Sequence, residues 1–200
     1  LARFQGSGSF ALEVMVSNFA YGKVLVIDSG YYAQRAKLIA EQAASSYRYI
    51  SSVGRISWDK LDDLNGDFDW IIACYTETSI GLKLNMDQLR SAADKVGAKL
   101  MIDATASIGL EDQHSMADAI SYSSCKGLFG LTGAGFVAFN DKPKNELPSF
   151  NLSITNHLEK KMTGPYHAIC SLDLILERYE HFKSAVVSNK RYFMQKFEGS

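Results

Sequence analysis

The sequence predicts an α/β fold, a three-layer sandwich in which a mainly parallel sheet lies between two layers of helices. Segments with helical spacing alternate along the chain with short strand-like runs, an order that is typical of βαβ units. The strand-like runs, such as residues 70–75 (WIIACY), are apolar at successive positions, as expected for strands that are covered on both faces. The chain has 200 residues, of which 46% are hydrophobic and 22% charged, and this composition indicates one folded domain with a buried core.

The individual elements follow from residue spacing and from residues that begin or end helices. Leu12, Met15 and Phe19 recur near helical intervals, which predicts a helix. Asn85 is suited to cap a helix and Gly97 to end it. Residues 1–5 are too short and polar a run to predict a strand, and residues 141–156 are polar and irregular. These patterns predict helices at 10–20, 34–45, 58–64, 85–96 and 167–197, and strands at 23–28, 47–52, 69–75, 99–103, 119–123 and 135–140.

The charge and hydropathy patterns exclude several classes of function. Lys and Arg number 21 against 22 Asp and Glu, so the net charge is −1, without the basic surplus of a nucleic-acid-binding domain. No apolar run approaches the ~20 residues that cross a bilayer, and the first ten residues lack the apolar core of a signal peptide. We therefore expect no nucleic-acid partner and no membrane segment, and the cysteine usage described next indicates a cytoplasmic location.

The cysteines and histidines predict neither a disulfide framework nor a metal site. Cys74, Cys125 and Cys170 are odd in number and widely spaced, and no C-x-x-C motif occurs, which fits free thiols in a reducing compartment. The histidines have no Cys or acidic partner at metal-ligand spacing. We expect no bound metal.

A glycine- and serine-rich turn at residues 5–9 (QGSGS) precedes the first predicted helix. Glycines let backbone N–H groups approach an anion, and a helix N-terminus favours negative charge. The turn is therefore a candidate phosphate site, and the alternative is a plain turn with a serine cap. Gly6-x-Gly8-x-x-Ala11 also matches a relaxed dinucleotide fingerprint, with Asp28 at the end of the next strand. That alternative, an NAD-dependent oxidoreductase, requires a strand directly before the turn.

Three further candidates stand at the ends of predicted strands, where parallel sheets bind ligands. Asp103 ends an apolar strand, where a carboxylate needs a partner; it could hold a proton on a ring nitrogen or act as a helix cap. Lys126 follows a strand and lies among small and apolar residues before a glycine-rich loop. We expect its amine to be buried there, which suits Schiff-base chemistry; the alternative is a solvated surface charge. Tyr31 and Tyr32 follow Gly30 and could stack on a flat ring or pack against the protein.

Together and in this order, these segments resemble the class V aminotransferases, which are pyridoxal phosphate-dependent enzymes of fold type I. The resemblance rests on residues 5–13 (QGSGSFALE), 31–35 (YYAQR), 77–81 (ETSIG), 103–107 (DATAS) and 123–127 (SSCKG). It implies that residues 1–200 are the pyridoxal phosphate-binding large domain in part, without the family's N-terminal segment and C-terminal small domain.

The resemblance also implies roles for individual residues. Lys126 would form the Schiff base with pyridoxal 5′-phosphate and move protons, and Asp103 would pair with the ring nitrogen. The cofactor would further be held by Ser7, Gly8 and Ser9 at its phosphate, by Tyr32 and Thr105 on the two ring faces, by Thr78 near the ring oxygen, by Ser123, and by Thr163 in a turn that reaches the neighbouring subunit.

The implied activity is transfer of an amino group from a small amino donor to a keto acid such as pyruvate, in a homodimer with a shared active site. The resemblance at residues 5–13 implies 2-aminoethylphosphonate as the donor, and an alanine–glyoxylate or serine–pyruvate type of reaction is the alternative. A cofactor-binding or dimerising domain without turnover is the non-enzymatic alternative. The chain departs from the family at Cys125, where Asn or Gln is usual, and at Tyr75-Thr76, where His-Cys often stands.

Overall fold

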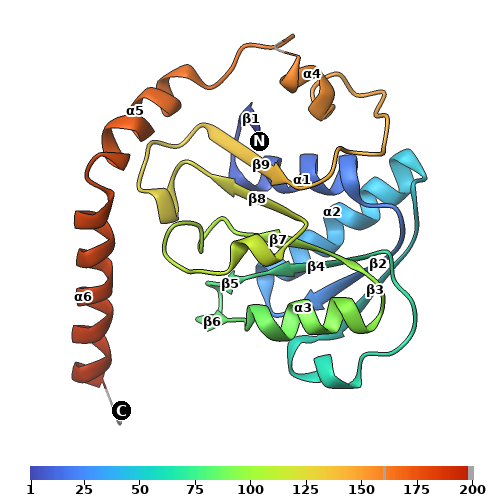
Figure 1. The fold of residues 1–200 in the computed structure, drawn as a ribbon, viewed down its shortest axis with the longest axis horizontal. Helices are drawn as coiled ribbons and strands as arrows, with labels where there is room; N and C mark the ends of the chain where they lie inside the picture. The colour runs from blue at the N-terminus through green and yellow to red at the C-terminus, as the bar shows by residue number, and fades with distance from the viewer. Residues whose placement is uncertain (160, 198–200) are drawn as a thin grey trace.

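The centre of the structure is a mainly parallel sheet (Figure 1). The structure is a computed structural model that describes residues 1–159 and 161–197. Within the described residues this sheet has seven strands. Their order across the sheet is β1 (Ala2–Gln5), β9 (Ala134–Phe139), β8 (Ala119–Ser123), β7 (Lys99–Asp103), β4 (Trp70–Cys74), β2 (Gly22–Asp28) and β3 (Ile50–Ser57). The run from β8 to β3 is parallel, whereas β9 is antiparallel to both of its neighbours.

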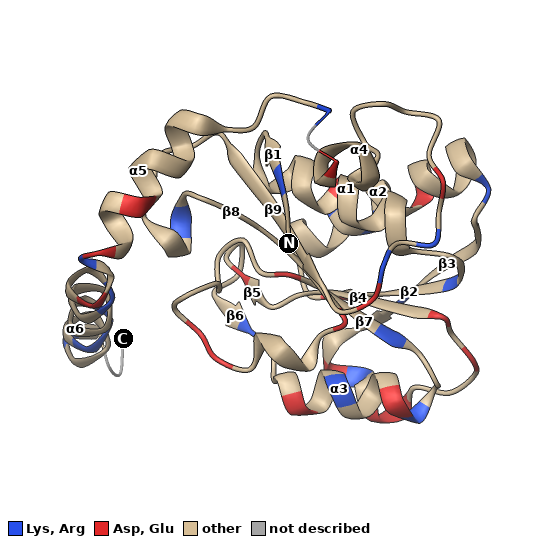
Figure 2. Cartoon of the chain, turned by 45° about the horizontal axis from the view of Figure 1, so that its top comes forward, with Lys and Arg blue, Asp and Glu red and all other residues tan. Residues whose placement is uncertain are grey.

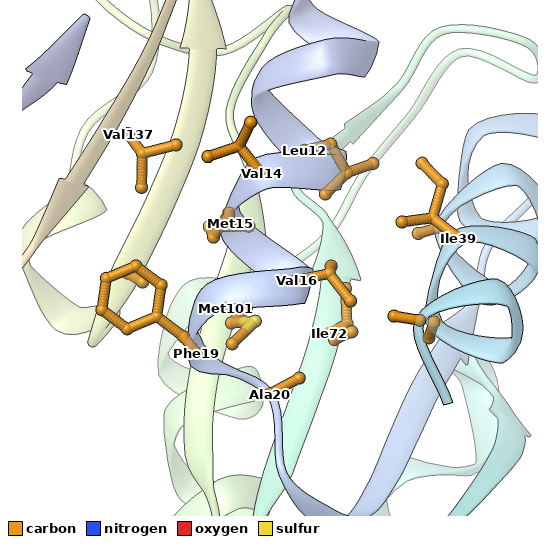
Figure 3. Packing of buried hydrophobic residues seen from close by; sticks show 14 of the residues in the cluster. Leu12, Val14, Met15, Val16, Phe19, Ala20, Ile39, Ile72, Met101 and Val137 are labelled. Carbon is orange, nitrogen blue, oxygen red and sulfur yellow. The ribbon is translucent and has the colours of Figure 1, made fainter. Parts of the chain in front are cut away.

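Helices cover both faces of the sheet. α1 (Gly8–Phe19) and α2 (Tyr31–Tyr47) pack on one face, and α3 (Met86–Lys95) and the 3₁₀ helix η1 (Trp58–Asp63) pack on the other, each over its own apolar cluster. In Figure 3, Leu12 of α1 lies toward Ile39 of α2, and Val16 lies next to Ile72 of β4. The apolar side chains of α1 are thus buried between the sheet and α2, and the predicted α/β fold with a mainly parallel sheet is confirmed.

The other described elements lie in the connections and after the sheet. They are the hairpin strands β5 (Thr76–Glu77) and β6 (Leu82–Lys83), the 3₁₀ helices η2 (His114–Met116) and η3 (Lys126–Leu128), and the helices α4 (Ile154–Leu158), α5 (Tyr166–Leu176) and α6 (Tyr179–Phe197). Among the described helices, none combines the length and apolar character needed to cross a membrane. Acidic and basic residues are mixed on the surface, as α3 shows with charges of both signs (Figure 2).

Residues 1–5, which are too short and polar a run to predict a strand from the sequence, include the strand β1. β1 pairs with β9 in a register that joins Ala2 to Val137 and Gln5 to Ala134. Its residues alternate between buried (Ala2, Phe4) and exposed (Arg3, Gln5), the pattern of a strand with one covered face. Four residues are too few for this alternation to stand out in the sequence, and the pairing with a strand from the other end of the chain decides it.

Two predictions about the elements were wrong. The predicted strand at 47–52 begins only at Ile50, because α2 continues to Tyr47 and Arg48 ends it in the left-handed conformation, with φ 60°. The predicted single helix at 167–197 is divided into α5 and α6. Directly after the break, the Tyr179 hydroxyl donates to the Gly127 carbonyl at 3.3 Å, so the turn brings the start of α6 onto the loop that follows β8. None of the residues of α6 is buried.

Candidate active site

A cavity of about 270 Å³ lies at the edge of the sheet where the parallel strands end. β4, β7 and β8 contribute their last residues, Cys74, Asp103 and Ser123. β9 runs the other way, so it reaches the same edge with the two residues before its start, Thr132 and Gly133. The volume is close to the lower end of the range of about 300–1,000 Å³ for small-molecule sites, and the position is where open α/β sheets bind ligands.

The structure brings together nearly all of the residues that the sequence predicts for the site. The predicted residues in the cavity wall are Ser7, Gly8, Ser9, Tyr32, Thr78, Asp103, Thr105, Ser123 and Lys126. The wall is completed by Gly6, Arg35, Cys74, Thr76, Ala106, Cys125, Thr132 and Gly133.

The first turn of α1 forms one end of the cavity. Ser7 caps the helix by accepting a backbone N–H of the first turn at its Oγ, and Ser9 Oγ accepts a hydrogen bond from Arg35 Nη1 at 2.7 Å. A Cβ at Gly8 would lie 2.7 Å from Thr105 Oγ1, so only glycine allows the turn to approach Thr105 this closely. The N–H groups of a first turn lack intrahelical partners, and this end of the cavity therefore suits an anionic group.

Asp103 lies at the end of β7 with only 9% of its surface exposed. Its Oδ1 accepts two hydrogen bonds from Thr105, from the backbone N at 3.0 Å and from Oγ1 at 2.6 Å. No donor among the described residues bonds to Oδ2. Burial raises the pKa of the Asp103 carboxyl above its ordinary value, although the Thr105 hydrogen bonds and the charges of Arg35 and Lys126 oppose the shift. A cationic N–H group in the cavity would stabilise this carboxylate.

Lys126 lies in the cavity wall in a strained loop. Its φ is 62°, in the left-handed region that non-glycine residues seldom adopt. The burial expected for Lys126 was wrong, because the residue is exposed at the cavity wall. Its Nζ lies 5.7 Å from the centre of the Tyr32 ring and forms no hydrogen bond or ion pair with any described residue. The loop is held tightly, since Ser124 Oγ donates to the Leu131 carbonyl at 2.5 Å and a Cβ at Gly127 would lie 2.3 Å from the Ile108 carbonyl oxygen. Strain of this kind is typical of functional sites.

Glu77 positions Tyr32 at the start of α2. This glutamate is fully buried, and its Oε2 accepts hydrogen bonds from the backbone N of Tyr32 at 3.0 Å and of Ala33 at 3.1 Å. Its Oε1 accepts a bond from Ser79 Oγ at 2.5 Å. A carboxylate at this place satisfies unpaired N–H groups and favours the helix dipole. Residues 77–79 thus hold the start of α2, and Thr78 lies exposed at the rim of the cavity.

Thr163 does not line this cavity. It lies in the wall of a separate cavity of about 480 Å³, beside Arg3 and Tyr166, and Gln5 Nε2 holds its turn to the end of β1 by donating to the Gly164 carbonyl at 3.0 Å. Within one chain Thr163 is therefore separate from Lys126. The predicted contact with the cofactor of a neighbouring subunit stays a prediction.

The dinucleotide alternative does not agree with the topology. The fingerprint requires a turn between two adjacent parallel strands, but β9, β8, β7 and β4 lie between β1 and β2. Asp28 is absent from the cavity wall and lies 3.5 Å from Arg55, between Oδ2 and Nη1. The match at Gly6 and Gly8 therefore does not indicate dinucleotide binding, because it lacks the adjacent parallel strands that this fingerprint requires.

The cysteines are unpaired within the described residues. Cys74 is buried in the cavity wall, and burial, followed by the charges of Asp103 and Glu77, raises the pKa of its thiol. Cys125, half-buried, lies with its Sγ 3.4 Å from Ser123 Oγ. No group of three His, Cys, Asp or Glu side chains suited to a metal ion occurs in the part of the chain that the structure describes.

Several wall residues were missed by reasoning from the sequence. Thr132 and Gly133 could be placed only once the antiparallel direction of β9 was known. Cys74 ends a strand, so it could have been predicted from the observation that parallel sheets bind ligands at their strand ends. Arg35 lies three residues after Tyr32 on α2, and this spacing puts both side chains on one face of the helix.

Solved structures with the same architecture include several aminotransferases and also other enzymes, such as a cysteine desulfurase from Thermococcus onnurineus NA1 with a TM-score of 0.66 and 14% identity, covering 98% of this chain and 57% of that one. An aspartate aminotransferase from Thermus thermophilus has a TM-score of 0.75 and 21% identity, covering 92% of this chain and 58% of that one. A pyridoxamine–pyruvate aminotransferase from Mesorhizobium loti has a TM-score of 0.73 and 21% identity, covering 92% and 54%. At these identities the likeness shows the fold, which is that of the aminotransferase structures.

Sequence comparison defines the family. The family model for class-V aminotransferases matches residues 5–164, and the chain belongs to this family, which confirms the predicted resemblance. It is 26% identical to the 2-aminoethylphosphonate–pyruvate transaminase of Pseudomonas fluorescens (strain Pf0-1) and 27% identical to that of Pseudomonas aeruginosa (strain UCBPP-PA14), with 94% of this chain covered in each case. The chain spans 56–57% of the length of these relatives.

Proposed function

We propose that this chain is the cofactor-binding part of a pyridoxal 5′-phosphate-dependent aminotransferase. The observation that carries the proposal is the meeting of an amine, a buried carboxylate and the first turn of α1 in one cavity: Lys126, Asp103 and residues 7–9. Membership of the class-V family supports it. When bound, the cofactor supplies the electron sink that makes the transfer of an amino group possible.

The residues in the wall fit this cofactor. Asp103 has one oxygen, Oδ2, to which no described residue donates, and burial raises the pKa of its carboxyl. A protonated ring nitrogen would therefore give this oxygen a partner. Ser7 and Ser9 at the start of α1 suit a phosphate group. Tyr32 and Thr105 supply an aromatic and a small side chain for the two faces of a flat ring, while Thr78 and Ser123 complete the wall.

Lys126 would carry both the covalent attachment and the proton transfer. A primary amine can bind an aldehyde carbon, and Nζ has no hydrogen-bond or ion-pair partner among the described residues that would compete. Nζ would also act on the substrate: as a general base it would take a proton from the carbon that bears the amino group, and as a general acid it would later give up a proton. Asp103, held by Thr105, would keep the ring nitrogen protonated during these steps.

The test of this proposal is an absorption titration with pyridoxal 5′-phosphate. Wild type is expected to develop a visible band, and the band should be lost in Lys126→Ala and kept in the matched control Lys83→Ala, a lysine that pairs with Glu111 outside the cavity. Borohydride reduction followed by peptide mass mapping should locate the adduct at Lys126. No band in wild type, or an adduct at another lysine, would count against the proposal, and tight NAD binding instead would favour the oxidoreductase alternative.

For the amino donor we propose 2-aminoethylphosphonate, with pyruvate as the acceptor. The support is the name shared by the relatives at 26–27% identity. The competing donor is alanine with glyoxylate as acceptor, the reaction named for a Nostoc enzyme of the same fold, with a TM-score of 0.72. A panel of amino donors, run on this chain and on one extended to the length of the relatives, decides between them; a higher kcat/KM for alanine would reject the phosphonate.

We further propose that residues 1–200 form a partial large domain that acts as a homodimer. Thr163 lies outside the cavity of its own chain, so a role at the cofactor requires a second copy. Light scattering after size-exclusion chromatography tests this directly, and a monomer that binds the cofactor as tightly as a dimer would contradict it. A cytoplasmic location stays a prediction from the cysteine usage.

A further inference from the structure

Arg35 is half-buried, and its guanidinium contacts a serine hydroxyl and two tyrosine rings in place of a carboxylate. Its Nη1 donates to Ser9 Oγ at 2.7 Å, and its guanidinium carbon lies 5.0 Å from the centre of the Tyr32 ring and 5.2 Å from that of Tyr31. It lines the cavity and forms no ion pair with any described residue. The charge of Asp103 reaches Arg35 across the cavity without an ion pair between them. A half-buried cation that lacks a directly paired carboxylate is costly, so its place at the cavity points to an anionic partner that comes with the ligand.

The hydrogen bond to Ser9 gives Arg35 a way to act on such a ligand. Because Arg35 occupies a lone pair of Ser9 Oγ, the serine is left with its own O–H to donate, and no described residue accepts that hydrogen. The two tyrosine rings restrict the guanidinium through cation–π contacts. Ser9 is thereby oriented as a donor at the end of the cavity formed by the first turn of α1.

We propose that Arg35 is a positioning residue that acts through Ser9 and makes the site select a ligand carrying a phosphate. The inference rests on the proposed function, in which that phosphate belongs to pyridoxal 5′-phosphate. Tyr32 contacts the same guanidinium, so the phosphate end and the ring face of the site are held by one side chain.

The test compares pyridoxal 5′-phosphate with pyridoxal, which lacks the phosphate. Dissociation constants are measured by absorption or fluorescence titration for wild type, Arg35→Met and Arg35→Lys. Arg35→Met keeps much of the apolar stem and should weaken binding of the phosphorylated ligand about tenfold or more, and binding of pyridoxal by less than about twofold. Arg35→Lys, a cation without the planar fork, should recover part of this loss. Arg55→Met is the matched control, because Arg55 is exposed and outside the cavity.

The route through Ser9 is tested by a double-mutant cycle. If Arg35 acts through Ser9, Arg35→Met on a Ser9→Ala background should change the affinity for pyridoxal 5′-phosphate by less than about twofold. Additive losses would reject this route. Equal losses for both ligands, or none, would overturn the inference as a whole, since a purely structural role lowers both affinities alike.

A separate measurement distinguishes failure of this inference from failure of the proposed function. Inorganic phosphate alone is added to wild type and Arg35→Met, and the melting temperature is recorded. If wild type takes up no pyridoxal 5′-phosphate but phosphate still stabilises wild type and not Arg35→Met, the proposed function fails and the anion selection by Arg35 stands. If phosphate stabilises both equally, the inference fails whatever the cofactor does.

Discussion

Gly8→Ala tests whether the close approach of α1 to Thr105 is needed for the site. The added Cβ would lie 2.7 Å from Thr105 Oγ1 and 2.8 Å from its Cγ2, where ordinary contacts begin at 3.4 Å, so Thr105 must move by about 0.7 Å. Overpacking of this kind costs about 1–3 kcal/mol. The same movement would disturb the 2.6 Å hydrogen bond from Thr105 to Asp103, and we therefore expect both lower stability and weaker binding of pyridoxal 5′-phosphate.

The assay is urea unfolding of the ligand-free protein, followed by the fluorescence of the buried Trp70. With a slope of about 1–3 kcal/mol/M in urea, a loss of 1 kcal/mol lowers the urea concentration at the unfolding midpoint by about 0.3–1 M. Gly164→Ala is the matched control, since its Cβ would meet nothing within 4 Å, and its stability should stay within about 1 kcal/mol of wild type. If Gly8→Ala is as stable as Gly164→Ala and binds the cofactor normally, the steric argument is refuted.

Two further variants test the buried polar groups. Asp103→Asn should stabilise the ligand-free protein. Burial raises the folded-state pKa of Asp103, so wild type loses stability as pH rises through that pKa. The gain in unfolding free energy of the variant should therefore be largest at high pH and vanish in acid, and a pH-independent difference would contradict this. Asn18→Ala removes bonds to the carbonyls of Val14 and Leu152 and from the N of Ile154. It should cost about 2–4 kcal/mol in urea unfolding, and a cost below about 0.5 kcal/mol would show that the network contributes little.

The alternation of apolar runs and helical spacing was sufficient to predict the layered α/β fold. Each helix and each strand of such a fold is buried by apolar residues that recur within a few positions of one another, so the pattern can be seen in a short stretch of sequence. The same local signals failed at β1, which is stable only by pairing with β9, a strand more than a hundred residues away. They also failed at residue 177, where the chain turns between α5 and α6 and the Tyr179 hydroxyl donates to the Gly127 carbonyl.

By itself, the sequence determined the chemical types present at strand ends and their order, and so it pointed to Asp103, Lys126 and the turn at residues 5–9. Only the tertiary structure decided that these groups share one cavity, that Arg35 joins them, and that Thr163 and Asp28 do not. The reason is physical. Which strand ends meet depends on the order and direction of the strands, and these are set by pairing and packing between distant residues. The type of each side chain, in contrast, is known from its own position in the sequence.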